Sequence, residues 1–457
     1  MFIFDTKERK KVQMDFSSES IVRMFVCGPT VQDAIHLGHA RTYIFFDVLA
    51  RYLRSKGLDV FYLQNITDID DKIIRKASEE GLSYREVADR NIKIYMDALR
   101  DLGIQSINFF AKSTHFIDRI IEQISTLLEN GSAYRTEDGV YFRVSSFKEY
   151  GSLSGQPQES LLEGARVETN NLKESQRDFV IWKGKKEGEP FWPSPFGEGR
   201  PGWHIEDTAI TETFFGYTYD IHGGGSDLIF PHHEAEIAIE RSISHEGFLS
   251  KFWIHTGMLN LNSEKMSKST GNFVSVESIL EKWNRFDLRF AFLNAYYRSS
   301  LNLSEDMLAE ARSNCTKFSN MYRRLKTDKF QGKGSAVLDG DWKKRMIDRF
   351  DDDMDIRGVI SLINEFVYSI NTSYSSLSSA EATEAVSILE WVNDILGIMD
   401  VSEKPGSNEN LIRAVIDIRN AMRGKRDFET SDLIRKKLLE GGIYIEDKDT
   451  GTIWWEK

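Results

Sequence analysis

Two histidines and a glutamate follow three glycines in the stretch HGGGSDLIFPHHEAE, residues 222 to 236. If a helix begins after Pro231, His232 and Glu236 share one helical face and could bind one metal ion from successive turns. A zinc site in a protein normally has four ligands, or three and a substrate, so further ligands would have to come from distant parts of the chain. The same pair is expected in a capped, solvated helix start, and the stretch alone leaves both interpretations open.

Two more histidines, His36 and His39, stand in the sequence HLGH at the expected start of a helix. The N-terminus of a helix presents free N–H groups and partial positive charge, so imidazoles placed there can help to hold phosphate oxygens as charge develops. Gly38 would let a flat ring approach the backbone closely. Taken alone, the pair could equally be two surface histidines at a helix cap.

A pair of lysines, Lys265 and Lys268, flanks Met-Ser in the Ser- and Gly-rich stretch NSEKMSKSTGN. Two lysines on a loop suit a leaving pyrophosphate, because they can close over it in the transition state and then release it. Each motif is weak by itself. Together, HLGH early in the chain and KMSKS late in the chain indicate nucleotide chemistry.

The segments around HLGH predict the scaffold that would position these residues. Residues 21–27 are β-branched and apolar and end before Gly28-Pro29, which predicts a buried strand. Residues 36–57 have apolar side chains at helical spacing and end in Gly57, and residues 59–67 predict a second strand. Strand, helix and strand form a βαβ unit, whose ligands bind at the carboxyl ends of the strands.

Further along the chain, a helix is expected at 113–131 and a hairpin at 133–144, with Asp138-Gly139 in its turn. The segment 183–203 is rich in Gly, Pro and charge and resembles an insertion between two halves of one sheet domain. From about Ser304 onward the pattern is helical, with a break at 401–410. Two more helices are expected within 412–442, before a short end at 443–457.

The composition limits the class of protein. A length of 457 residues suggests two to four domains, and 40% hydrophobic residues are ample for real cores. The start lacks a signal peptide and no later segment approaches eighteen uninterrupted apolar residues, so a soluble cytoplasmic protein is expected. Cys27 and Cys315 are the only cysteines, which excludes a disulfide framework. A net charge of −12 argues against a general coating of nucleic acid but leaves room for a local basic face.

The chain resembles the class I aminoacyl-tRNA synthetases, and in detail the cysteinyl-tRNA synthetases, over essentially its whole length. The resemblance rests on CGPTV, HLGHAR, NITDIDDKII, RPGWHIE, HGGGSDLIFPHHEAE, KMSKSTGN and the terminal IEDKDTGTIW. It implies an α/β fold with a Rossmann-like parallel sheet split by an insertion, followed by an all-α bundle. The implied domains are a first Rossmann half at 1–115, a connective insertion at 116–200, a second Rossmann half at 201–245, a stem-contact fold with the KMSKS loop at 246–302, a helical bundle at 303–400 and an anticodon-binding domain at 401–457.

The resemblance also assigns site residues. In the family a zinc ion is held by a cysteine after the first strand, a cysteine after GWHIE, and the first histidine and second glutamate of PHHExE. Here these positions are Cys27, Asp207, His232 and Glu236, so one cysteine is replaced by an aspartate. A second departure is Gln32, where family members commonly have tyrosine. The implied amino-acid pocket is Gly28, Thr30, Thr67, Trp203 and His222, and the implied ATP contacts are His36, His39, Asp227, Lys265 and Lys268, of which the histidines and lysines would be catalytic.

The replacement at Asp207 leaves two possibilities. Aspartate carries the same charge as a cysteinate and is an accepted zinc ligand, and a zinc ion that binds the substrate thiolate rejects serine without an editing site. Alternatively, the chain is a paralogue whose pocket has moved toward another amino acid, with Asp207 as a direct substrate contact.

The resemblance implies a cysteine–tRNA ligase with cysteine, magnesium-bound ATP and tRNA(Cys) as partners, acting as a monomer. A ligase that joins an amino acid to a small amine is a rival, although such relatives lack a terminal anticodon module. A catalytically silent RNA-binding paralogue is another, although the intact HLGH and KMSKS argue against silence. Near the end of the chain, cations beside aromatic rings suit unpaired anticodon bases, unless they form only a solvated helix end; they are Arg419, Arg423, Lys425, Arg426 and Trp454.

Overall fold

The computed structural model describes residues 1–16, 21–155, 171–244, 249–261, 264–265, 274–335, 338, 340–401, 409–448 and 451–456. The chain forms two compact units, Met1–Asp400 and Val401–Lys457. Among the described helices there is none whose length and apolar character would let it cross a membrane.

A five-stranded parallel sheet forms the centre of the first unit, with the strand order β11-β10-β3-β4-β5. The chain runs outward from β3 to β5 and later returns on the other side of β3 with β10. The order therefore reverses between β3 and β10, and ligands of open α/β sheets bind at the carboxyl ends of the strands at such a point. The expected strands at 21–27 and 59–67 are confirmed. The strands are β3 (Val22–Val26), β4 (Val60–Ile66), β5 (Phe109–Lys112), β10 (Tyr219–Gly225) and β11 (Ser250–Thr256).

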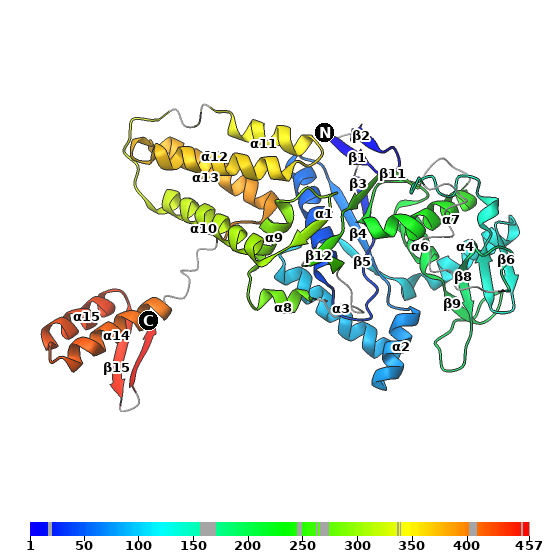
Figure 1. Cartoon of the computed structure of the whole chain (residues 1–457), viewed down its shortest axis with the longest axis horizontal. Helices are drawn as coiled ribbons and strands as arrows, with labels where there is room; N and C mark the ends of the chain where they lie inside the picture. The colour runs from blue at the N-terminus through cyan, green and yellow to red at the C-terminus, as the bar shows by residue number, and fades with distance from the viewer. Residues whose placement is uncertain are drawn as a thin grey trace. The chain divides into compact units, whose positions relative to one another are not determined.

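Helices cover both faces of this sheet, which is why neighbouring residues of β3 such as Met24 and Phe25 are both buried. Helix α1 (Leu37–Ser55) lies on one face, and α6 and α7 lie on the other (Figure 1). The expected βαβ unit and the helix in 113–131 are confirmed. The remaining helical segments of this part are α2 (Asp71–Glu80), α3 (Tyr84–Asp101), η1 (Ser113–Phe116), α4 (Ile117–Glu129), η2 (Val144–Ser146), α6 (Trp203–Phe215), η3 (Ser226–Leu228), η4 (Ile229–His233) and α7 (Glu234–Ser244).

A separate antiparallel sheet, in the order β6-β7-β8-β9, stands between the two halves of the central sheet in sequence. It begins with the expected hairpin, whose Gly139 has φ of +150° and whose Cβ would fall 2.1 Å from the carbonyl oxygen of Trp182. Only glycine fits that turn. The strands are β6 (Ala133–Thr136), β7 (Gly139–Phe142), β8 (Phe179–Gly184) and β9 (Gly199–Pro201).

Beyond β11 the chain forms a small sheet in the order β13-β12-β14. Strand β12 is parallel to β14 and antiparallel to β13. The elements are β12 (Leu259–Leu261), β13 (Glu264–Lys265), α8 (Val276–Leu280), α9 (Arg285–Leu293) and β14 (Leu301–Leu303), and the N-terminus adds the pair β1 (Phe2–Asp5) and β2 (Lys10–Gln13).

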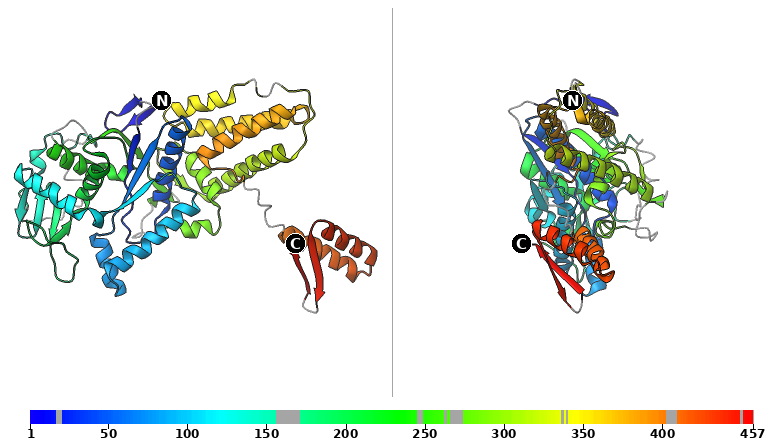
Figure 2. Two further views of the ribbon diagram at one scale, coloured as in Figure 1. Left: turned by 180° about the vertical axis from the view of Figure 1, so that it is seen from behind. Right: turned by 90° about the vertical axis from the view of Figure 1, so that its left-hand side faces the viewer.

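Four helices complete the first unit, as the helical pattern after Ser304 predicts. They pack side by side, with α10 against α12 and α13, and α11 against α12 (Figure 2). They are α10 (Glu305–Thr327), α11 (Trp342–Asp351), α12 (Ile356–Thr372) and α13 (Ser379–Leu396), with the short η5 (Tyr374–Ser376) between the last two.

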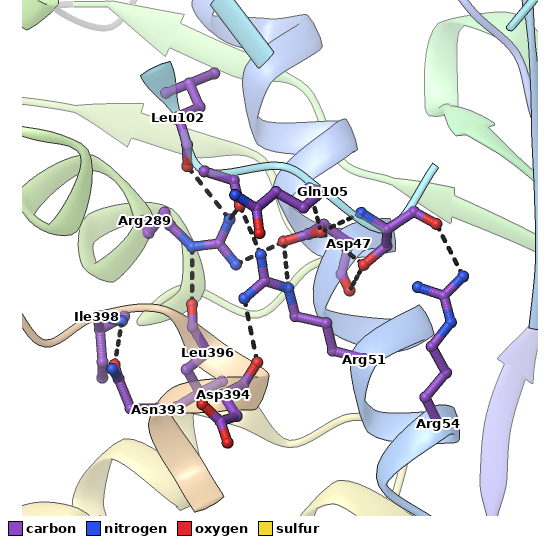
Figure 3. Close-up of polar contacts among 12 residues, drawn as sticks. Asp47, Arg51, Arg54, Leu102, Gln105, Arg289, Asn393, Asp394, Leu396 and Ile398 are labelled. Atoms are coloured by element: carbon purple, nitrogen blue, oxygen red, sulfur yellow. Dashed lines mark hydrogen bonds and ion pairs between the residues drawn. The ribbon is translucent and has the colours of Figure 1, made fainter. Parts of the chain in front are cut away.

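A buried carboxylate joins these helices to the central sheet. Asp47 of α1 is paired with Arg289 of α9 at 2.8 Å and with Arg51 at 2.9 Å, and Arg289 donates to the carbonyl of Leu396 at the end of α13 (Figure 3). Burial alone would raise the pKa of Asp47, but Arg289 and Arg51 bring it below its ordinary value. One ionised side chain thus fixes α1, α9 and the end of the helical bundle together.

The second unit contains the two expected helices, α14 (Glu409–Gly424) and α15 (Phe428–Glu440). Its end is an antiparallel hairpin of β15 (Ile443–Lys448) and β16 (Gly451–Glu456), which the sequence analysis left as a short tail. Ile412, Ile416, Leu438 and Ile445 form a core of its own between helices and hairpin.

Candidate active site

One cavity of about 310 Å³ lies at the carboxyl ends of β3 and β10, at the point where the strand order reverses. Cys27, Gly28 and Thr30 line it just after β3, and Trp203 lines it from the start of α6. His36 and His39 line it from the start of α1. Residues predicted for the amino-acid pocket and residues predicted for ATP therefore face the same space, and Trp203 reaches it from far along the chain.

The histidines of HLGH form the N-terminal cap of α1. The Nδ1 atom of His36 accepts hydrogen bonds from the backbone N–H groups of Gly38 at 3.1 Å and His39 at 3.3 Å, and the two rings stack with centroids 3.8 Å apart. The stack stands at the positive end of the helix dipole, beside the cavity. The arrangement suits phosphate oxygens.

The second nucleotide motif is only partly described. The backbone of Lys265 belongs to β13, opposite Asn260 of β12. The side chain of Lys265 and the whole of Lys268 lie outside the described residues, so their place relative to the cavity stays a prediction.

A buried cluster lies next to the cavity: its Cys27 lines the cavity, whereas Asp207, His232 and Glu236 do not. The Nε2 atom of His232 lies 3.1 Å from Oδ2 of Asp207 and 3.0 Å from Oε1 of Glu236, which is one helical turn further along the chain. The Sγ atom of Cys27 donates to Oδ2 of Asp207 at 3.6 Å. Asp207, His232 and Glu236 form one of the groups of possible metal ligands among the described residues, with ligand atoms within 4.8 Å of one another.

The electrostatics of this cluster favour a cation. Oδ1 of Asp207 and both carboxylate oxygens of Glu236 are buried without a hydrogen-bond partner in the described part of the chain, although the Nε2 atoms of His232 and His222 lie 3.0 and 3.5 Å from the two Glu236 oxygens. Burial, and then the charges of Asp207 and Glu236, raise the pKa of the Cys27 thiol well above its ordinary value, and burial and Asp207 raise the pKa of Glu236. A divalent ion would satisfy the bare oxygens and favour the thiolate. Cysteine, histidine and carboxylate donors are a set that zinc accepts.

The aromatic rings around His232 hold it in place. Trp203 lies flat on the His232 ring, with centroids 4.1 Å apart and 7° between the planes. The Nδ1 atom of His204 lies 3.0 Å from Nδ1 of His232. If the Nδ1–H group of His232 donates to His204 in this contact, the Nε2 atom of His232 is unprotonated. Its lone pair then points toward Asp207 and Glu236, as a metal ligand requires.

Two residues of the predicted amino-acid pocket do not line the cavity. The backbone of Thr67 exchanges hydrogen bonds with Pro29 and Val31, so Thr67 supports the strand end that carries Thr30. His222 is fully buried behind the cluster, where its Nδ1 lies 2.6 Å from the Tyr219 hydroxyl and its Nε2 lies 3.5 Å from Glu236. Both residues hold the wall of the cavity from behind.

The turn after β10 and the segment after Cys27 complete the lining. Asp227 lines the cavity from η3, and a Cβ on Gly225 would come within 2.5 Å of its Oδ1 atom. Gln32 also lines the cavity, and its Oε1 atom is buried without a hydrogen-bond partner among the described residues. A Cβ on Gly28 would fall 1.8 Å from the carbonyl oxygen of Asn65, so glycine is required there.

Sequence reasoning missed three residues of this region. His204 follows Trp203 directly, and that adjacency was the available signal. Lys72 lines the cavity from the start of α2, where the run NITDIDDKII marks a strand end and helix start. His233 comes within ligand range of Cys27 and His232, and its Nδ1 atom lies 2.8 Å from Nε2 of His255.

The cations predicted to meet RNA differ in exposure, and Arg419 requires a correction. It is 1% exposed, and its guanidinium is held by both oxygens of Asp447 at 2.7 and 2.8 Å, so it joins α14 to β15 and offers no surface contact. Arg423, which also pairs with Asp447, is exposed, as are Lys425 and Arg426. Trp454 is half-buried against the core of the second unit. Phe428, 57% exposed at the start of α15, is an aromatic surface that the sequence analysis did not single out.

Known proteins are similar to this chain in sequence and in fold. The family model for the tRNA synthetases class I (C) catalytic domain matches residues 13–313. Cysteine–tRNA ligase of Thermoplasma acidophilum is 47% identical over 458 residues, covering 100% of both chains. Cysteine–tRNA ligase of Clostridioides difficile is 41% identical over 465 residues, covering 99% of both chains. A crystal structure of Mycobacterium tuberculosis methionyl-tRNA synthetase bound by methionyl-adenylate is similar in fold, with a TM-score of 0.65 at 16% identity over 83% of this chain and 92% of that one.

Proposed function

This chain belongs to the cysteine–tRNA ligase family of class I tRNA synthetases, and from that premise we propose how its residues activate L-cysteine with ATP and join it to the 3′ end of tRNA(Cys). In the first step a carboxylate oxygen of cysteine attacks the α-phosphorus of ATP, and the bond to the β-phosphate oxygen breaks to release pyrophosphate. In the second step a ribose hydroxyl of the terminal adenosine attacks the adenylate carbonyl, and AMP leaves. Neither step needs a covalent enzyme intermediate.

Cys27, Asp207, His232 and Glu236 would hold one zinc ion. Their donor types, their burial and the bare oxygens of Asp207 and Glu236 support this assignment. Bound zinc would supply selectivity, because a soft thiolate binds it strongly and the hydroxyl of serine does not. Asp207 keeps the ligand charge of the family's cysteine.

The cysteine substrate would lie between this cluster and the start of α1. Gly28, Thr30 and Trp203 face the cavity there and would contact it, while Thr67 and His222 support them from behind. The stacked ring of Trp203 covers one side of the His232 ring.

ATP, with magnesium, would bind along the other side of the cavity. His36 and His39, at the positive end of the α1 dipole, would hold phosphate oxygens, and Asp227 would contact the nucleotide from the turn after β10. Lys265 and Lys268 would stabilise the charge on the leaving pyrophosphate. These contacts lower the barrier by positioning and by charge stabilisation.

The second unit would bind the anticodon of tRNA(Cys). Arg423, Lys425 and Arg426 are exposed at the end of α14, and Phe428 adds an exposed ring next to them. Cations beside a stacking surface suit unpaired bases. The enzyme would act as a monomer in the cytoplasm.

The observation that carries this proposal is that one cavity is lined both by Cys27 and Trp203 and by His36 and His39. ATP–pyrophosphate exchange across a panel of amino acids, without tRNA, tests it. Exchange that requires cysteine and rejects serine, with about one zinc per chain by elemental analysis, is the expected result. Exchange with a different amino acid would instead identify a paralogue of altered specificity.

A further inference from the structure

Arg41, on the second turn of α1, is a buried arginine surrounded by backbone carbonyls. It is 3% exposed. Its Nη1 atom donates to the carbonyls of Gly257 at 2.9 Å and Met258 at 2.8 Å, and its Nη2 atom donates to those of Tyr296 at 3.2 Å, Tyr297 at 3.5 Å and Ser299 at 2.7 Å. No ion pair of Arg41 with a carboxylate occurs within the described ranges.

The carbonyls come from two segments that enter neighbouring strands. Gly257 and Met258 lead directly into β12, and Ser299 leads into β14, which pairs with β12. Strand β12 also pairs with β13, which contains Lys265. One guanidinium of α1 therefore binds the segments that enter β12 and β14, and β12 pairs with the strand of Lys265.

A second attachment lies on the other side of the KMSKS residues. His36 forms a β-bridge with Ser275, and the backbone N–H of Val276 donates to the carbonyl of Ile35 at 3.4 Å. The chain between Met258 and Ser275 is thus attached at both ends to residues 35–41. The hydroxyls of Thr42 and Thr256, 2.7 Å apart, add a further contact next to Arg41.

Burying a cation without an anion is expensive unless many hydrogen bonds offset the cost. Burial lowers the pKa of Arg41 to about 10, so the side chain is still charged at neutral pH. A planar fork can reach two separate segments at once, whereas the donors of a lysine all radiate from one atom. The site therefore depends on the shape of arginine as well as on its charge.

We propose that Arg41 is a positioning residue for adenylate formation, which sets the β12–β14 pair, and through β12 the strand of Lys265, at a fixed place relative to His36 and His39. This inference rests on the proposed function, because it assumes that those residues hold the phosphates of ATP. Of the five residues that Arg41 contacts, Gly257 and Met258 line the cavity, but none belongs to the cysteine pocket of Gly28, Thr30 and Trp203. Loss of the fork should therefore reduce turnover and leave recognition of cysteine intact.

The test is cysteine-dependent ATP–pyrophosphate exchange by the full-length Arg41→Lys enzyme. We expect kcat to fall about 10- to 100-fold, since a misplacement of about 1 Å can cost that much, with the KM for cysteine within about twofold of the wild type. Arg54→Lys is the matched control. Arg54 lies further along α1 and donates to the carbonyls of Val60 and Ser106 and to Asn108, away from the small sheet. The kcat of Arg54→Lys should therefore stay within about twofold of the wild type.

Gly257→Ala is a second variant that should displace the segments entering β12 and β14. A Cβ there would fall 2.3 Å from the carbonyl oxygen of Ser299 and 2.5 Å from that of Arg298, which would push apart the segments that Arg41 joins. It should reproduce the loss of kcat with an unchanged KM for cysteine. The inference is overturned by a normal kcat in either folded variant, by an equal loss in Arg54→Lys, or by a parallel rise in the KM for cysteine. Absence of exchange in the wild type would overturn the proposed function as well.

Discussion

The Nε2 atom of His232 lies 3.1 Å from Oδ2 of Asp207. Asp207 is the residue that stands where the family pattern has a cysteine. The carboxylate keeps the charge of the thiolate but is a harder ligand with a shorter bond to zinc. The second oxygen of Asp207 has no hydrogen-bond partner among the described residues, so the side chain has spare capacity for a cation. We therefore expect the replacement to preserve a metal site of altered composition.

Replacing Asp207 by alanine should therefore weaken zinc binding and raise the KM for cysteine at least about tenfold. Even the loss of a side chain that only orients a metal ligand reduces metal affinity or activity about tenfold or more. Asp207→Cys is the control, and it should keep about one zinc per chain and nearly normal kinetics. Elemental analysis and exchange kinetics measure the two effects. A metal-free wild type that activates serine as well as cysteine would show that Asp207 contacts the substrate directly.

Cys27→Ser should lose both zinc and cysteine activation, because Cys27 is the only thiol that the cluster supplies. Cys315 is the natural control: it is buried far along the chain in α10, where its Sγ donates to the carbonyl of Phe286. Cys315→Ser should keep its metal. Equal zinc content in the two variants would remove Cys27 from the ligand set.

Lys268→Ala should slow pyrophosphate exchange by a factor on the order of 10² to 10³. This is the usual effect of removing one group that stabilises negative charge in the transition state. The KM for cysteine should change little, because the lysine is assigned to the phosphates. Exchange at the wild-type rate would exclude Lys268 from the mechanism.

Glu240 in α7 gives a pH dependence of stability outside the active site. It is 1% exposed with both oxygens unpartnered in the described chain, and burial followed by the charge of Glu212 raises its pKa from 4.5 to about 9. Between these values the folded state keeps a proton that the unfolded state has lost, so stability falls as pH rises, by at most about 1.4 kcal/mol per pH unit. Its contribution is complete below pH 4.5 and gone above about pH 9.

Glu240→Gln imitates the protonated acid and removes this dependence. In thermal denaturation the variant should gain stability over the wild type at pH 8 and differ little from it at pH 5. A gain of equal size at both pH values would mean that the carboxyl does not titrate as proposed.

Much of the local structure could be predicted from the sequence. The β-branched apolar run before Gly28 predicted β3, and the helical spacing of apolar residues predicted α1. The spacing of His232 and Glu236 predicted neighbours on one face, and the two side chains lie 3.0 Å apart. The approach of Asp207 and Cys27 to that pair depends on the order of strands in the sheet, which no local pattern contains. Without the family resemblance, the sequence would have indicated only His232 and Glu236 as candidate metal ligands.

Two failures near the end of the chain have a similar cause. A helical pattern shows that Arg419 is a cation on α14, but its burial depends on Asp447, which lies across the unit on β15. The hairpin itself depends on pairing between Ile443–Lys448 and Gly451–Glu456, where short alternating runs gave a weak signal. The five carbonyls around Arg41 are backbone groups and leave no trace in the sequence.

The second unit should be needed for tRNA charging and not for adenylate formation. Residues 401–457 form a compact unit with its own core, and all described residues of the cavity lie in the first unit. Deleting 401–457 should leave cysteine-dependent exchange within a few-fold of the wild type while aminoacylation of tRNA falls strongly. Equal loss of both activities would assign the unit a merely structural role.

A point substitution in the same unit can separate base stacking from charge. Phe428 is 57% exposed and follows Lys425 and Arg426 closely, so its ring can stack on an unpaired base. Stacking on an aromatic ring contributes about 1 to 3 kcal/mol per base, so Phe428→Ala should lower kcat/KM for tRNA by roughly 5- to 150-fold with unchanged exchange. Leu433→Ala is the matched control, since Leu433 is also an exposed apolar residue of α15, at 56%, but has no ring to stack. If the two variants lose tRNA charging equally, the loss reflects the apolar surface of α15, and Phe428 has no special part in reading the anticodon.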